Sequence, residues 1–317
     1  MEVSNIKMEL NLQNITKDQH FVPVCYLRNF CDDSEQVNRK KNPRAWRYDK
    51  LSKCAEFKGV KSMCFSTKLY SINNKSESVI DDSIKDKETF FESHFLHDIE
   101  QTYSPILKKI IACVKQKKFG GEQKEQLSKF IAIQYLRDPI MKCLCESHEE
   151  IPYFRLTEDY LRLVQSNPDI LDDPSMKHFM YAYGNKDMIH TLARSLAYSE
   201  WTFHYSQNDV FYTSDNPVCL AQDKPNAQNG EGSSNKGKLH IVFPVSKNIL
   251  LQITQGLQIN EIICIDNTPQ WQIDNFNFIQ AYFAKKYIIS ATNSFSTIED
   301  KMNNNSFSWD TDKMNLY

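Results

Sequence analysis

The chain has 317 residues, 41% of them hydrophobic and 25% charged, which is the composition of a globular protein long enough for one large domain or two interlocked halves. Its 38 basic and 40 acidic residues give a formal net charge of -2, so a nucleic-acid partner would need a local basic patch. The eight glycines form no Gly-rich phosphate loop, which argues against P-loop and dinucleotide-binding folds.

Two further features of the composition predict a cytoplasmic location. The nine cysteines are an odd number and include no CxxC pair, as is typical of a protein from a reducing compartment. The sequence contains no apolar run of about 18 residues and opens with no signal-peptide pattern. We therefore expect no membrane partner, and the sequence leaves the oligomeric state open.

The first informative element is the stretch from Gln19 to Phe30. Pro23 favours an extended Val22 and suits the first turn of a helix, so His20 should lie just before a short helix with a buried aromatic face. Two interpretations of His20 stay open. It either caps this helix or satisfies a buried carbonyl, or it acts as a general base or metal ligand.

Short strands are predicted at 45–49 and within 61–70, before a long amphipathic helix. Apolar residues recur every three or four positions over 88–114, which is the period of a helix with one buried face. Glu92 and Glu100 lie on its other faces near histidines. Such a carboxylate–imidazole set either binds a metal or forms solvated ion pairs.

A second helix is predicted over 122–137. Gln134 falls on its apolar stripe, where another apolar residue would be expected, and Arg137 comes at its end just before an Asp-Pro pair. These two residues indicate a buried polar site. Arg137 has an equally good simple explanation, because a cation at a helix C-terminus complements the helix dipole.

The apolar period changes from helical to alternating beyond Glu200. Further helices are predicted before that point, and afterwards strands at 201–205, 209–213, 239–244, 249–254 and 286–291, with one helix at 273–284. We predict an α+β fold in which mainly helical N-terminal two thirds pack on a C-terminal, mostly antiparallel sheet. The chain is then one domain over 1–317, or a helical part at 18–198, a β-rich part at 199–291 and a flexible tail at 292–317.

The run Ser214-Asp215-Asn216-Pro217 interrupts these strands. Its polar side chains suit a turn in which they bond neighbouring backbone N–H groups. The functional interpretation is a carboxylate and an amide displayed at a sheet edge. There, Asp215 could bind a cation or serve as a general base, and Asn216 could orient a phosphate or a carbonyl.

Taken together, these motifs resemble a largely bacterial family known as domain of unknown function 4238. The resemblance spans about residues 18 to 291 and rests on His20-x-Val22-Pro23, Tyr26-Leu27-x-x-Phe30, Trp46-x-Tyr48, Glu92, Glu100, Phe130-Ile131-Ala132-x-Gln134-x-x-Arg137, Thr213-Ser214-Asp215-Asn216-Pro217, Phe243-Pro244 and Asn277. It implies no activity, because the family has no settled one. It implies that the five polar residues at motif positions form one constellation: His20, Gln134, Arg137, Asp215 and Asn216. The character of the family also suggests a role in bacterial antiviral defence or as a toxin.

The first functional hypothesis is a nuclease-like hydrolase of phosphodiesters. His20 would be its general acid or base, Arg137 would stabilise the developing phosphorane charge, and Asp215 and Asn216 would complete the catalytic set. The partner would be nucleic acid. Neither an HNH nor a PD-(D/E)xK signature is present, so this hypothesis rests on residue types alone.

A divalent ion, Mg²⁺ or Mn²⁺, would serve this hydrolase. Asp215 with Glu92 or Glu100 would hold the ion, and Gln134 and Ser214 would bind the substrate. The alternative hypothesis is a non-catalytic ligand-binding or sensor protein. In that case the same residues form a polar pocket or fasten the helical part onto the sheet.

Overall fold

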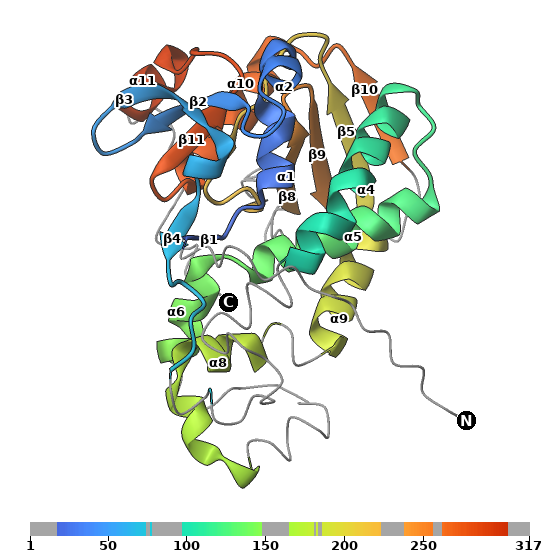
Figure 1. Ribbon diagram of the computed structural model, residues 1–317. Helices are drawn as coiled ribbons and strands as arrows, with labels where there is room; N and C mark the ends of the chain where they lie inside the picture. The colour runs from blue at the N-terminus through green and yellow to red at the C-terminus, as the bar shows by residue number, and fades with distance from the viewer. Residues whose placement is uncertain are drawn as a thin grey trace, which may run out of the picture.

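The computed structural model describes residues 18–73, 77, 97–147, 165–180, 182, 186–222, 238–255 and 262–303, which form an α+β fold with mostly antiparallel sheets (Figure 1). The described helices are α1 (Val24–Leu27), α2 (Asp33–Asn38), α4 (His97–Lys115), α5 (Gly121–Leu136), α6 (Pro139–Ser147), α8 (Pro174–Phe179), α9 (Lys186–Ala197), α10 (Gln270–Phe283) and α11 (Ser296–Asn303). The described strands are β1 (Asp18–His20), β2 (Arg44–Asp49), β3 (Cys54–Gly59), β4 (Phe65–Thr67), β5 (Glu200–Tyr205), β6 (Thr213–Ser214), β7 (Cys219–Gln222), β8 (Leu239–Ser246), β9 (Ile249–Thr254), β10 (Ile262–Asp266) and β11 (Tyr287–Ser290).

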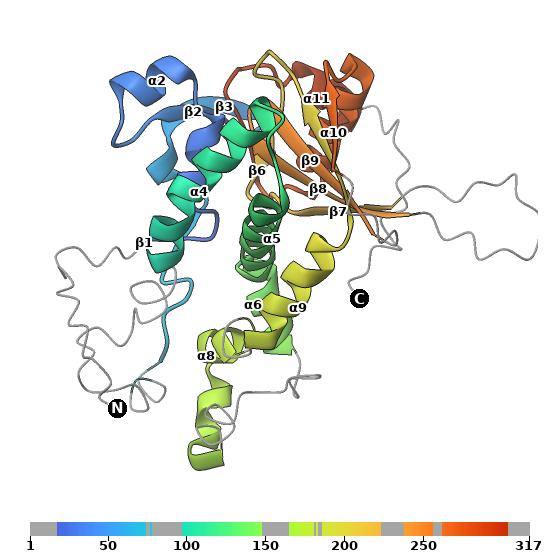
Figure 2. The same cartoon turned by 90° about the vertical axis from the view of Figure 1, so that its right-hand side faces the viewer.

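The five-stranded sheet has the order β10-β5-β9-β8-β7, and β10 is its one strand that pairs in parallel. Alternate residues of β8 and β9 point to opposite faces, as the strand period of two requires. Phe243 and Leu251 belong to the core with Phe130 of α5, whereas Val242 and Leu250 pack with residues of α10. In Figure 2 this sheet separates α4 and α5 from α10.

The four-stranded sheet, in the order β3-β2-β11-β6, joins segments that are far apart in the sequence. Tyr48 of β2 pairs with Ile288 of β11, which in turn pairs with Ser214 of β6. A small third sheet pairs β1 with β4. The ladder from β2 to β11 therefore ties residues near the start of the chain to residues near its end, across the boundary at 198/199 that the sequence suggests.

The segment predicted to be a flexible tail is partly described. Over 292–303 it contains α11, and Phe295 and Ile298 are each 3% exposed. Both side chains pack in a cluster with Tyr48 and Tyr212. This part of the segment is therefore held against the four-stranded sheet by buried aromatic contacts.

The strand predicted over 209–213 is wrong for most of that range, because only Thr213 belongs to β6. The N–H groups of Val210 and Phe211 both donate to the Lys247 carbonyl at 3.0 Å. The Asn277 side chain accepts from Tyr212 N at 2.9 Å and donates to Val210 O at 2.7 Å. A helix side chain thus takes the place of a neighbouring strand.

The sequence analysis also misses or overextends several short elements. It does not predict β3 or β10, and the strand placed within 61–70 is confined to β4. The predicted helix over 122–137 is confirmed as α5, with a shift of one residue at each end. Of the helices that the structure describes, none combines the length and the apolar character needed to cross a membrane.

Candidate functional site

The N-terminal motif is fixed by a buried tyrosine. Pro23 has φ -60° and precedes α1, as its ring geometry favours, and Tyr26 of α1 is 0% exposed. The Tyr26 hydroxyl donates to Pro244 O at 2.7 Å and lies 2.8 Å from Thr213 Oγ1. Burial raises the pKa of this phenol well above its ordinary value, so it stays protonated. Three sequence motifs therefore meet at one hydroxyl group.

The end of α5 is joined to the strand β1 by two side chains. Gln134 Nε2 donates to Phe21 O at 3.0 Å, and Arg137 Nη2 donates to His20 O. Arg137 is 0% exposed, and the Tyr70 hydroxyl donates to its carbonyl at 2.5 Å. Arg137 is therefore buried, and its guanidinium bonds a carbonyl from another segment.

The His20 ring is half-buried and lies beside another carbonyl. Its Nε2 is 3.0 Å from Lys61 O, and its centroid is 5.7 Å from that of Phe65. A neutral ring that donates from Nε2 keeps Nδ1 as its basic nitrogen. The contact of Nε2 with Lys61 O agrees with the interpretation in which His20 satisfies a carbonyl. If His20 also transfers a proton, Nδ1 is the nitrogen that would do so.

Asp215 bonds the main chain of another segment through both of its carboxylate oxygens. Its carboxylate accepts N–H groups from Lys285 at 2.8 Å, Lys286 at 2.7 Å and Tyr287 at 3.0 Å. The residue is 3% exposed, and burial raises the pKa of its carboxyl group even though these N–H donors act in the opposite direction. Asp215 thereby holds the turn between α10 and β11.

Ser214 and Asn216 bond the same part of the fold. Ser214 Oγ lies 2.9 Å from Asn216 O and 3.1 Å from Gln280 Oε1 of α10. The N–H of Asn216 donates to Ser214 Oγ at 3.2 Å, and Asn216 Nδ2 donates to Phe283 O at 3.3 Å. The turn that the sequence suggests for this motif is therefore formed, with α10 as its main partner.

Two residues that the sequence analysis did not select connect these groups. The Lys285 ammonium contacts Asp138 Oδ1, and Asp138 follows Arg137 directly. Because the main chain of Lys285 also donates to Asp215, contacts run from His20 through α5 to the Ser-Asp-Asn-Pro turn. We call this set the motif junction: His20, Gln134, Arg137, Asp138, Ser214, Asp215, Asn216 and Lys285. The one sequence signal for Asp138 is its position beside Arg137, and nothing local marks Lys285.

A family model for the "Protein of unknown function (DUF4238)" matches residues 18–294. The chain belongs to this family. Searches with this chain find no match among the curated proteins and none among the solved structures. The DUF4238 match covers every residue of the motif junction and both glutamates proposed as metal ligands.

The two glutamates proposed as metal ligands are Glu92 and Glu100. Glu92 lies outside the described part of the chain, and Glu100 falls in the first turn of α4. Within the described residues, no three His, Cys, Asp or Glu side chains gather as a metal site. A divalent ion stays a prediction of the sequence analysis.

A second feature of this DUF4238 chain is a cavity between α5 and α9. It has a volume of about 680 Å³, and we call it the basic groove. Gly121, at the start of α5, lines this cavity. Its charged lining consists of one acidic residue, Glu125, and basic residues from both helices: Lys124, Lys129, His190 and Arg194. Basic side chains outnumber acidic ones in this lining, so the local electrostatic potential favours anions.

The basic side chains of the groove differ in how firmly they are held. Lys124 Nζ donates to Ser199 O at 2.9 Å and lies 5.4 Å from the centroid of the Trp201 ring. Burial lowers the pKa of Lys124. Arg194 lies over the Tyr198 ring at 5.6 Å, and Lys129 is exposed. The groove thus has one anchored lysine and exposed cations at its rim.

Proposed function

We propose that the protein binds a phosphate-bearing polyanion, with nucleic acid as the first candidate, in the basic groove. The observation that carries this proposal is the convergence of Lys124, Lys129 and Arg194 on one cavity of about 680 Å³. Lysine and arginine side chains supply most contacts to phosphate backbones. The start of α5 at Gly121 also lines the groove, and the N-terminal end of a helix favours anions.

In this proposal the motif junction is a positioning device. The side chains of Gln134, Arg137 and Asp215 are engaged with main-chain atoms of other segments. Such contacts fasten the end of α5 to β1 and, through Asp138, to the turn after α10. Because α5 is one rigid helix, holding its C-terminal end also orients Lys124 near its start and Lys129 at its middle.

Cleavage of the bound strand is the second candidate function. What supports it is the half-buried imidazole of His20, a residue whose main-chain carbonyl accepts a hydrogen bond from the buried Arg137 guanidinium. In this proposal Asp215 with Glu92 or Glu100 would hold Mg²⁺ or Mn²⁺, and Gln134, Ser214 and Asn216 would orient the substrate. The biological role that would go with this cleavage activity is that of a nuclease in bacterial defence, or of a toxin, acting in the cytoplasm.

Binding of fluorescent single-stranded RNA and DNA across a range of salt concentrations tests the first proposal. The double variant Lys129→Gln/Arg194→Gln removes two groove charges. The control Lys40→Gln/Lys58→Gln removes two charges elsewhere, that of exposed Lys40 and that of half-buried Lys58. The groove variant should bind more weakly, with its log–log salt slope reduced by about 1.4, since each single-strand phosphate contact contributes about 0.7. The control variant should bind like the wild type.

Absence of salt-dependent binding by the wild type would refute the proposal, as would an equal loss in both variants. The same samples, incubated with Mg²⁺, Mn²⁺ or chelator, test cleavage. The nuclease candidate requires products with wild type and none with folded His20→Ala. Binding without products would leave the binding protein as the function.

A further inference from the structure

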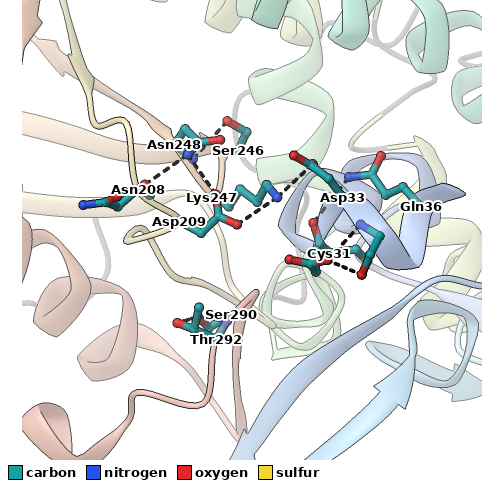
Figure 3. A network of polar contacts seen from close by, with 12 residues as sticks. Cys31, Asp33, Gln36, Asn208, Asp209, Ser246, Lys247, Asn248, Ser290 and Thr292 are labelled. Atoms are coloured by element: carbon teal, nitrogen blue, oxygen red, sulfur yellow. Dashed lines mark hydrogen bonds and ion pairs between the residues drawn. The ribbon is translucent and has the colours of Figure 1, made fainter.

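A third polar region lies away from both the motif junction and the basic groove. It is a cavity of about 320 Å³ between α2, α4 and the turn from β8 to β9. We call it the Lys247 cavity; polar residues dominate its lining, which includes Asn29, Asp33, Lys108, Lys115, Lys247 and Asn248. Figure 3 shows the Lys247 side chain reaching from its turn toward Asp33, with Asp209 alongside.

Lys247 is a buried cation with two carboxylate partners. Its side chain is 7% exposed, and Nζ lies 2.9 Å from Asp33 Oδ1 and 2.8 Å from Asp209 Oδ2. Burial alone would lower the pKa of this ammonium, but the bonds to Asp209 and Asp33 outweigh it and raise the pKa. Lys247 therefore stays charged, which makes it a donor for anions.

The two carboxylates are held very differently. The Asp209 side chain is 25% exposed and also accepts from Asn248 Nδ2 at 2.9 Å, within the turn that positions Lys247. The Asp33 side chain is 87% exposed and lies at the start of the six-residue helix α2. An ion pair to so exposed a carboxylate contributes little net stability, so the Asp33 oxygen is the replaceable partner.

A neighbouring amide group is left without an acceptor. Asn29 Nδ2 is buried and has no hydrogen-bond partner among the residues that the structure describes. The Asn29 carbonyl accepts from Lys247 N at 3.0 Å, so the two residues are adjacent in the wall of the cavity. A buried donor without an acceptor is destabilising, and an anionic ligand would supply the missing acceptor.

We propose that the Lys247 cavity binds a small carboxylate- or phosphate-bearing ligand, whose anionic oxygens bond Lys247 in place of Asp33. Asn29 donates to the same group, and Lys108 and Lys115 of α4 attract it from the rim of the cavity. Asp33 occupies the site as an internal substitute for the ligand. This site is independent of the polyanion binding proposed for the basic groove.

Titration of the wild type with malonate and, separately, inorganic phosphate tests this site, with Asn side-chain NMR signals and calorimetry as readouts. Asp33→Asn removes the competing charge and should tighten binding about two- to fivefold, the factor that replacing an exposed ion pair implies. Lys108→Gln/Lys115→Gln should weaken it. Asp266→Asn removes an exposed partner of Lys117 elsewhere and should leave affinity unchanged.

The two probes distinguish the chemical class of the ligand. Tighter binding of malonate would identify a carboxylate site, and tighter binding of inorganic phosphate would identify a phosphate site. Movement of the Asn29 and Asn248 signals on titration would support the proposal. Two results would overturn it: no response to either probe at millimolar concentration, or equal affinity in wild type, Asp33→Asn and the α4 double variant. All four altered positions are exposed, so these variants should fold.

Discussion

The motif junction and the basic groove place polar residues in opposite circumstances. In the junction, the buried side chains of Gln134, Arg137 and Asp215 bond main-chain atoms from distant segments. In the groove, Lys129 and Arg194 are exposed around a cavity. The junction residues stand out in the sequence because polar groups are unusual at such positions, whereas surface lysines do not stand out. Unusual residues can therefore mark where a fold is fastened as readily as where it acts.

The largest effect should come from removing the Asp215 carboxylate. Asp215→Ala leaves three part-buried N–H groups without their acceptor, at up to about 1–3 kcal/mol for each unsatisfied donor. Partial rehydration reduces that sum, so we expect about 3–5 kcal/mol less free energy of unfolding in urea. The control Asp266→Asn should lose under about 1 kcal/mol, because its ion pair is exposed. Equal losses in the two variants would mean that the junction does not fasten the fold.

An acid titration should produce a somewhat smaller effect through His178, which lies beside the junction. Its Nε2 is 2.8 Å from Leu136 O of α5, and burial lowers the pKa of His178 from 6.5 to about 4. Because the unfolded chain binds the proton more readily, stability is full above pH 6.5 and is lost as the pH falls toward 4. The shift corresponds to about 3 kcal/mol.

The variant His178→Gln isolates this contribution. His204 also has a pKa lowered by burial to about 4, but it lies in the five-stranded sheet and bonds Gln252 Oε1 at 3.3 Å. Between pH 7 and pH 4 the wild type should lose about 3 kcal/mol more free energy of unfolding than His178→Gln, which lacks the titrating ring. His204→Gln should behave in the same way. Parallel curves would exclude a buried neutral histidine at the junction.

Local periodicity explains which parts of this fold the sequence reveals. The helical period locates α5 and the alternating period locates β5 and β9, because each pattern is set by neighbouring residues on one buried face. The pairing of β2 with β11 depends on contacts between segments more than 200 residues apart, and no local pattern contains it. The edge strand β10 is largely exposed, so its apolar signal is weak.

The same limit applies to the candidate site. The sequence identifies His20, Arg137 and Asp215, since each is an unusual polar residue inside a motif. It does not identify Lys285, whose side chain meets Asp138 across 147 positions of the chain. It also does not identify the groove, because Lys124 on α5 and Arg194 on α9 come together only when the two helices pack.

The smallest expected change in stability provides the sharpest test of the comparison. Lys129 and Arg194 are exposed, so Lys129→Gln/Arg194→Gln should alter the free energy of unfolding by no more than about 0.5 kcal/mol. Lys124→Gln differs, because the Lys124 ammonium bonds Ser199 O and lies near Trp201; its loss should cost about 1–2 kcal/mol. Urea denaturation and oligonucleotide binding on the same samples separate the two roles. A rim variant that loses stability as much as Lys124→Gln would show that the rim cations also fasten the helices, and the distinction between fastening and binding residues would then be wrong.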